Sequence, residues 1–223
     1  MVVTFEDLLK ELEIHTSKAA STSKGMDTNP TTGKDSSEKE TTLETVRREM
    51  TKQGLDPSLG RLDELFAKMK MQEIPGGRGW YIFGNTGTGK TARARIAAKL
   101  TGIELVDACE YSWEVIRTLT RDFDLMKACR LRQNLDGYVV GNHLIIDDLG
   151  TEPNEVNIFG TKINPMQFIL ERRLNHWPKV KTYITSNLTR ADLGRRYGER
   201  TLSRFEGSMI FIPLVGKDWR KDS

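Results

Sequence analysis

Two patterns of hydrophobic positions alternate along most of the chain. Short apolar runs are separated by segments in which apolar residues recur at helical spacing. Consecutive apolar residues are typical of strands that are buried on both faces of a sheet. The pattern therefore predicts an α/β fold, with a five-stranded parallel sheet and helices on both of its faces. The expected strands are WYIFG, IELVD, HLIIDD, KTYITSN and MIFIPL, and the expected helices cover residues 42–53, 57–71, 90–100, 112–135 (in one or two pieces), 165–177 and 190–205.

The chain before residue 42 follows a different pattern. Between residues 4 and 14, apolar residues recur at helical spacing, which predicts a short amphipathic helix that is marginal alone in water. Residues 15–41 are dominated by Ser, Thr, Lys, Gly and Asp, and cannot build a core. We therefore expect a partner-docking helix in residues 1–14, a flexible polar linker in residues 15–41 and a folded domain in residues 42–223. The alternative is a terminal helix that packs onto its own domain.

Composition narrows the class of protein. The 223 residues suffice for one domain with a substantial core and a small appendage. No apolar run approaches the ~20 residues of a membrane-spanning helix, and the chain shows no secretory signal pattern. The two cysteines form no CxxC or Cys/His motif, so we expect neither a disulfide framework nor a zinc site. These features predict a soluble cytoplasmic protein without a membrane partner, and the net charge of +3 permits nucleic-acid contact without requiring it.

The segment GNTGTGKT carries the clearest chemistry. It matches GxxxxGK[ST] at each fixed position and lies between a predicted strand and a predicted helix. Its glycines allow successive backbone N–H groups to face one anion, and the following helix adds the positive end of its dipole. We expect Lys90 to reach the β- and γ-phosphates of a nucleoside triphosphate and the Thr91 hydroxyl to bind Mg²⁺. The predicted nucleotide-binding residues are Gly84, Asn85, Thr86, Gly87, Thr88, Gly89, Lys90 and Thr91.

The segment LIIDDLG supplies the carboxylates that hydrolysis requires. Asp147 follows a buried strand, at the end where parallel sheets bind ligands, and we expect it to hold Mg²⁺. We expect Asp148 to orient the attacking water or accept its proton. Many ATPases carry Glu at this second place, and the shorter Asp favours slow turnover. Glu152 is a second candidate for the same role.

Polar residues near the end of the chain complete the candidate set. If the strand YITSN lies beside the strand of the phosphate loop, Asn187 points at the γ-phosphate, while Thr189 caps the next helix. Arg200 and Arg204 lie one turn apart on one helical face. Such arginines stabilise charge on a transferring phosphate, often from a neighbouring subunit. Arg220, after the last strand, is a further candidate for phosphate contact.

The combination of motifs resembles the AAA+ ATPases, specifically the helicase loaders of the DnaC and DnaI type and the related transposition helper IstB. The resemblance rests on GNTGTGKT, LIIDDLGTE, TSNLT, GERTLSRF and DWRK, which occur in this order within residues 80–221. It implies an enzyme that hydrolyses ATP with Mg²⁺, with a lid domain that is essentially absent. The roles that it implies are Walker A for Lys90 and Thr91, Walker B for Asp147 and Asp148, sensor 1 for Asn187, arginine finger for Arg204 with Arg200 beside it, and sensor 2 for Arg220.

The resemblance also implies a biological role. An ATP-dependent homo-oligomer would load the replicative helicase, bound through the N-terminal helix, onto single-stranded DNA. An insertion at residues 110–135 would contact the DNA, since it holds Tyr111, Trp113 and Phe123 among arginines. Alternatively, Trp113 packs inward and the arginines face water.

Other functions stay open. The first alternative is a transposition helper that delivers a transposase to DNA. The N-terminal region resembles no known module of the loaders, so the partner of this region distinguishes the two functions. A small-molecule kinase and a binding module that uses ATP without hydrolysing it are further alternatives, which an assay of ATP hydrolysis would separate from an ATPase.

Overall fold

The computed structural model describes residues 41–122, 124–133, 139–158 and 161–216. The predicted helix in residues 1–14, nearly all of the predicted linker, and Arg220 lie outside the described residues. Within the part of the chain that is described, none of the helices has the length and apolar character needed to cross a membrane.

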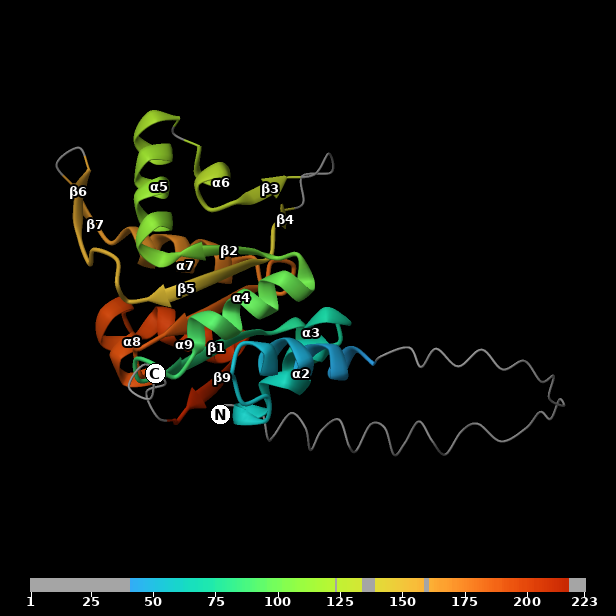
Figure 1. Ribbon diagram of the computed structural model, residues 1–223. Helices are drawn as coiled ribbons and strands as arrows, with labels where there is room; N and C mark the ends of the chain where they lie inside the picture. Colours follow the sequence, from blue (N-terminus) through green and yellow to red (C-terminus); the bar gives the residue numbers. More distant parts are fainter. Residues whose placement is uncertain (1–40, 123, 134–138, 159–160, 217–223) are drawn as a thin grey trace, which may run out of the picture.

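A five-stranded sheet forms the centre of the fold (Figure 1). All of its neighbouring strands run parallel. The predicted α/β fold with a five-stranded parallel sheet is therefore confirmed. Across the sheet, the order is β2 (Glu104–Asp107), β5 (Leu144–Leu149), β8 (Thr182–Ser186), β1 (Gly79–Gly84) and β9 (Met209–Leu214).

Helices cover both faces of this sheet, because the strand side chains alternate between two cores. Trp80 and Ile82 of β1 belong to one core, whereas Tyr81 belongs to the other. The first core is closed by α2 (Thr42–Lys52), α3 (Leu62–Lys70) and α4 (Lys90–Thr101). The second is closed by α5 (Ala108–Arg121), α7 (Pro165–Asn175), α8 (Arg190–Tyr197) and α9 (Glu199–Ser208).

The start of the domain and the last helical segment differ from the predicted boundaries. The helix expected at 57–71 begins only at Leu62, after the 3₁₀ turn η1 (Leu59–Arg61), in which Gly60 has a φ of 67°. A second 3₁₀ turn, η2 (Pro75–Gly77), leads into β1. The segment expected as a helix at 190–205 is divided at Gly198, whose φ of 84° lies outside helical geometry.

The helix expected at residues 112–135 is wrong in its last part. After α5 comes the short α6 (Leu125–Ala128), and then β3 (Leu131–Gln133) pairs antiparallel with β4 (Val139–Gly141). Figure 1 shows α5, α6 and β3 together beyond the β2 edge of the sheet. A second hairpin, β6 (Val156–Ile158) and β7 (Thr161–Ile163), follows β5 and was not predicted. Strands this short carry too few residues for a periodic signal.

Candidate nucleotide-binding site

The phosphate loop joins β1 to α4 and lines a pocket of about 480 Å³. This volume lies in the range of small-molecule sites. Gly87 and Gly89 have φ values of 84° and 78°, which side-chain-bearing residues rarely adopt. The Thr88 hydroxyl donates to the Asn85 carbonyl at 2.9 Å, and this hydrogen bond stabilises the turn of the loop. Of the predicted loop residues, Thr86, Gly87, Gly89, Lys90 and Thr91 line the pocket, whereas Gly84, Asn85 and Thr88 support it.

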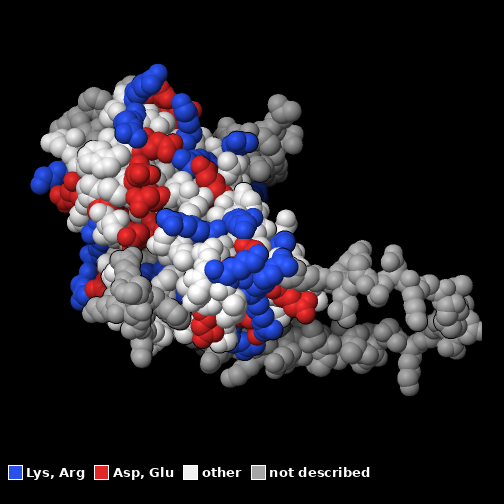
Figure 2. Space-filling model, viewed as in Figure 1, with Lys and Arg blue, Asp and Glu red and all other residues white. Residues whose placement is uncertain are grey.

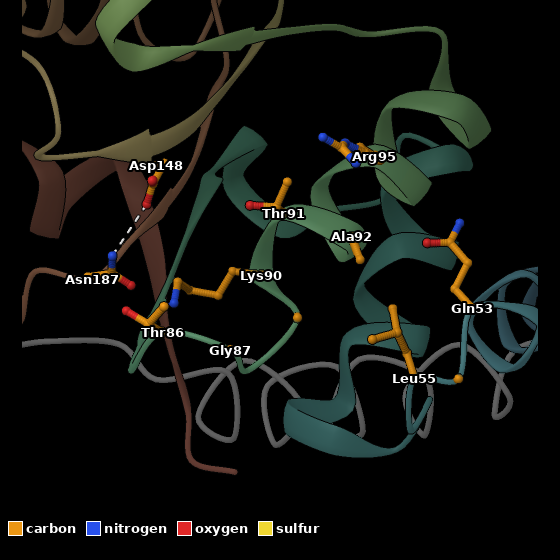
Figure 3. Close-up of a pocket in the computed structure, with 12 residues that line it drawn as sticks. Gln53, Leu55, Thr86, Gly87, Lys90, Thr91, Ala92, Arg95, Asp148 and Asn187 are labelled. Carbon is orange, nitrogen blue, oxygen red and sulfur yellow. Dashed lines mark hydrogen bonds between the residues drawn. The ribbon is translucent and has the colours of Figure 1, made fainter. Parts of the chain in front are cut away.

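Lys90 is the first residue of α4 and lies almost fully buried. Its ammonium group donates to the carbonyl oxygens of Gly84, at 2.8 Å, and Asn85, at 2.7 Å. These contacts hold the positive charge against the loop (Figure 3). Phosphate oxygens are stronger acceptors than carbonyls, so an incoming phosphate can replace them without a large movement of the side chain.

Asp147 joins three segments of the chain. Its Oδ1 accepts from the Thr91 hydroxyl of α4 at 3.3 Å, and from the Thr185 hydroxyl of β8 through a short contact. Mg²⁺ prefers oxygen ligands and is commonly held by one or two carboxylates together with substrate phosphates. Among the described residues, no group of three or more His, Cys, Asp or Glu side chains could hold a metal ion. The facing hydroxyl and carboxylate of Thr91 and Asp147 are oxygen ligands of the kind that Mg²⁺ prefers.

Asp148 points into the pocket because of an irregularity in β5. The pairing of β5 with β8 shifts register between Ile146 and Leu149, and Asp148 has a φ of 57°. Its N–H donates to the side-chain hydroxyl of Thr185 in β8 at 2.9 Å. A bulge of this kind redirects a side chain at the end of a strand. Asp148 consequently lines the same pocket as Lys90 and Thr91.

Asn187 lies opposite Asp148 (Figure 3). Its amide donates to Asp148 Oδ1 at 3.4 Å. As expected for Asn187, the strand before it lies beside the strand of the phosphate loop: β8 pairs directly with β1, and Ser186 lies in register with Phe83. Thr189 caps α8, as expected, by accepting from the Asp192 N–H at 3.3 Å.

Glu152 lies apart from the pocket, under α8. Its side chain is fully buried; Oε1 accepts from the Tyr197 hydroxyl at 2.5 Å and from Arg196 Nε at 3.2 Å. Its Oε2 accepts from the Gly150 N–H at 2.8 Å. Burial first, and then the Glu152 carboxylate, raise the pKa of Tyr197, which stays a donor in this network. Of the two candidates for orienting water, the geometry therefore favours Asp148.

The two candidate arginines of α9 lie elsewhere. Arg200 is exposed and Arg204 is partly buried. Neither lines the nucleotide pocket, and within the described part of the chain neither side chain forms an ion pair. Their role toward a neighbouring subunit stays a prediction, as does that of Arg220.

Five pocket residues were not predicted from the sequence, and one of them, Ala92, directly follows Thr91. Arg95 lies one helical turn after Thr91, so helical spacing could have indicated it. Gln53, Gly54 and Leu55 come from the end of α2, and only the packing of α2 beside α4 brings them to the pocket. Figure 2 shows Lys and Arg side chains gathered over α4 and α2 next to this wall.

The insertion offers fewer DNA contacts than its sequence indicated. The alternative is wrong for Trp113, of which 45% is exposed, but Arg117 and Arg121 face water as it expected. Tyr111 is buried, however, and Arg130 forms ion pairs with Glu104 and Glu114. Phe123 lies outside the described residues. Figure 2 shows acidic side chains along α5 and basic ones at its far end, where the sequence places Arg117 and Arg121.

Comparison with known proteins identifies the fold. The sequence matches no protein-family model, and no curated protein is significantly similar to it. The chain is similar to the replication initiator DnaA bound to AMPPCP and single-stranded DNA, with a TM-score of 0.53 and 18% identity over 82% of this chain and 52% of that one. AMPPCP-bound DnaA from Aquifex aeolicus gives a TM-score of 0.49, 19% identity, and coverage of 82% and 53%. The structure of the DnaC helicase loader gives a TM-score of 0.48 and 20% identity, over 70% of this chain and 89% of that one. The chain spans about half the length of the DnaA structures. The likeness to DnaA bound to single-stranded DNA shows that this chain shares the α/β fold of that protein.

Proposed function

We propose that the chain is an ATPase that binds ATP with Mg²⁺ in this pocket and hydrolyses it. The observation that carries the proposal is the meeting of Thr91, Asp147, Asp148 and Asn187, which come from the ends of three different strands or the loops beyond them. In parallel sheets, ligands bind at these carboxyl ends. The resemblance of the motifs to AAA+ ATPases and the DnaA-like fold support the same function.

Each residue has a role that its contacts support. Lys90 binds the β- and γ-phosphates, and Thr91 and Asp147 hold Mg²⁺. The ion, when bound, neutralises negative charge on the phosphates. Asp148 accepts the proton of a water whose oxygen attacks the γ-phosphorus, while the bond to the ADP oxygen breaks. Asn187 keeps the Asp148 carboxylate in place through its 3.4 Å contact.

We further propose that this ATPase is a helicase loader. In an ATP-dependent homo-oligomer, Arg204 and the adjacent Arg200 reach the neighbour's triphosphate, and Arg220 contacts the phosphates as well. The exposed face of α5, with Trp113, Arg117 and Arg121, contacts single-stranded DNA. The exposure of Arg200 supports the first role, and the exposure of Trp113, Arg117 and Arg121 supports the second. The helix in residues 1–14 binds the replicative helicase.

The experiment that tests this function uses the full chain and a variant without residues 1–14. Each is assayed for release of phosphate from MgATP and for ATP-dependent binding to the purified replicative helicase of the host. The proposal expects hydrolysis by both proteins and helicase binding by the full chain alone. Binding of a transposase instead would support the transposition helper. ATP binding without phosphate release would indicate a binding module, and phosphate transfer to a small molecule would indicate a kinase.

A further inference from the structure

A fully buried arginine lies directly behind the phosphate loop. Arg93, in the first turn of α4, has 0% of its surface exposed. Arginines are almost never fully buried unless they are paired. In the described part of the chain, no carboxylate lies within ion-pair distance of Arg93. Burial lowers the pKa of its guanidinium, and the nearby Asp56 partly offsets this effect. Other contacts of the guanidinium must therefore compensate for the burial of its charge.

The guanidinium joins the two walls of the pocket through backbone carbonyls. Its NH1 donates to the Thr88 carbonyl of the phosphate loop at 2.9 Å, and its NH2 donates to the Asp56 carbonyl at 3.0 Å. The Asp56 side chain in turn accepts from the N–H and hydroxyl of Ser58, at 2.9 and 2.7 Å. Asp56 directly follows Leu55, which lines the pocket.

Packing around Gly89 makes this junction tight. A Cβ added to Gly89 would lie 2.8 Å from Arg93 NH1 and 2.8 Å from Leu55 Cδ2. Arg93 and Leu55 therefore both pack closely against Gly89, and Leu55 lies against the phosphate loop at this point. A larger residue at position 89 would require one of these two side chains to shift.

The wall that Arg93 holds lies away from the phosphate chemistry. In Figure 3, Leu55, Gln53 and Ala92 lie on one side of the loop, and Asp148 and Asn187 lie on the other. Since Asp148 and Asn187 mark the γ-phosphate end, the base and ribose extend toward Leu55. Leu55 and Ala92 offer this end an apolar surface.

We propose that Arg93 is a positioning residue that fixes the Leu55 wall against the phosphate loop and thereby sets the affinity for the nucleoside part of the nucleotide. This inference rests on the proposed function only in requiring that ATP binds in this pocket. Arg93 touches no part of the nucleotide itself. Its effect is transmitted through Asp56 and Leu55, so it acts on the nucleoside and not on the phosphates.

The test compares two ligands on the full-length chain. Arg93→Met removes both donors at similar side-chain length, and Lys99→Met, on an exposed face of the same helix, is the matched control. Dissociation constants are measured by calorimetry for MgATP and for inorganic triphosphate with Mg²⁺. The expected result for Arg93→Met is an increase of about tenfold or more in the Kd for ATP. The Kd for inorganic triphosphate should stay within about twofold, and the control should change neither constant.

Arg93→Lys protects the test against a variant that fails to fold. Lysine keeps the charge, but its point-like ammonium cannot span the carbonyls of Thr88 and Asp56 as a guanidinium fork does. It should therefore show the same selective loss of ATP affinity. Equal losses for both ligands would mean that Arg93 acts through the phosphate loop, and unchanged constants would mean that it has no role in binding. Either result overturns the proposal. Failure of the wild-type chain to bind ATP would instead overturn the proposed function, and this proposal with it.

Discussion

Asp148 is the residue at which local conformation and chemistry are most closely linked. Its φ of 57° is uncommon for a residue other than glycine. Such conformations cost on the order of 1 kcal/mol and are retained where the surrounding structure fixes them. Here the Thr185 hydroxyl and the Asn187 amide provide that fixation. The strained backbone turns the carboxylate into the pocket instead of along the strand.

Asp148→Asn tests the role of this carboxylate. The amide keeps the size of the side chain but cannot accept a proton, so hydrolysis should fall by about 10²–10⁴-fold. The affinity for ATP should stay nearly unchanged, because Lys90 and the loop bind the phosphates. Phosphate release and ATP binding are measured in parallel, with Asp122→Asn, an exposed substitution on the insertion, as the control. Hydrolysis at the wild-type rate would show that another group orients the water.

Sequence alone could propose Asp148 and Glu152 but could not choose between them. Both carboxylates follow the same strand, and their spacing gives no sign that a turn carries Glu152 beneath α8. Its partners, Arg196 and Tyr197, are more than forty positions away in the chain. The phosphate loop, in contrast, was predictable because its residues are contiguous. Arg93 went unnoticed because nothing in a helical sequence distinguishes a buried arginine from an exposed one.

At the scale of the elements, Glu152 connects the end of β5 to α8. The Gly150 N–H, Arg196 and Tyr197 all donate to its buried carboxylate. The helix that they hold leads into α9, which carries Arg200 and Arg204. The loop beside the nucleotide pocket and the arginine-bearing helix pair are therefore joined at one point.

Glu152→Ala should destabilise the fold substantially. Removing one partner of a buried ion pair leaves the other uncompensated, at a typical cost of about 3–5 kcal/mol. The lower end is expected here, because 22% of the Arg196 side chain is exposed and water can approach it. The free energy of unfolding is measured by urea denaturation. Arg195→Ala, which breaks an exposed pair with Asp192, is the control and should cost less than about 1 kcal/mol. Equal effects of the two substitutions would contradict a structural role for Glu152.

The strands of the central sheet were predictable, whereas the two hairpins were not. Buried parallel strands such as Leu144–Leu149 are long apolar runs, and this signal is local. The strands Leu131–Gln133 and Val156–Ile158 are short, and they exist through pairing with a partner strand. The helix predicted for the insertion therefore wrongly included the strand Leu131–Gln133.

At the scale of the whole molecule, the insertion projects from the edge of the sheet with Trp113 on its surface. If the exposed face of α5 contacts single-stranded DNA, Trp113 provides a surface on which a base can stack. Trp113→Ala should then weaken binding to a single-stranded oligonucleotide by about 5–100-fold, since stacking contributes about 1–3 kcal/mol per base. Met71→Ala is the control, because Met71 is an equally exposed apolar residue that lies outside the insertion, at the end of α3. Fluorescence anisotropy measures the affinity, and equal affinities of the two variants would remove DNA contact from this surface.

In the proposed oligomer, the arginines of α9 act on a neighbouring subunit, because they do not line the pocket of their own chain. Arg204→Ala should bind ATP normally yet hydrolyse it at least about 10³-fold more slowly, since the group that stabilises the transition state comes from the neighbour. Lys90→Ala should fail to bind ATP but still carry an intact Arg204. Mixing the two inactive variants should therefore restore part of the hydrolysis, because a Lys90→Ala subunit supplies its arginine to the pocket of an Arg204→Ala subunit. Arg195→Ala mixed with Lys90→Ala controls for surface charge. Hydrolysis of ATP by Arg204→Ala alone at the wild-type rate would contradict the proposal that Arg204 acts across a subunit interface. A mixture without restored hydrolysis would contradict it as well.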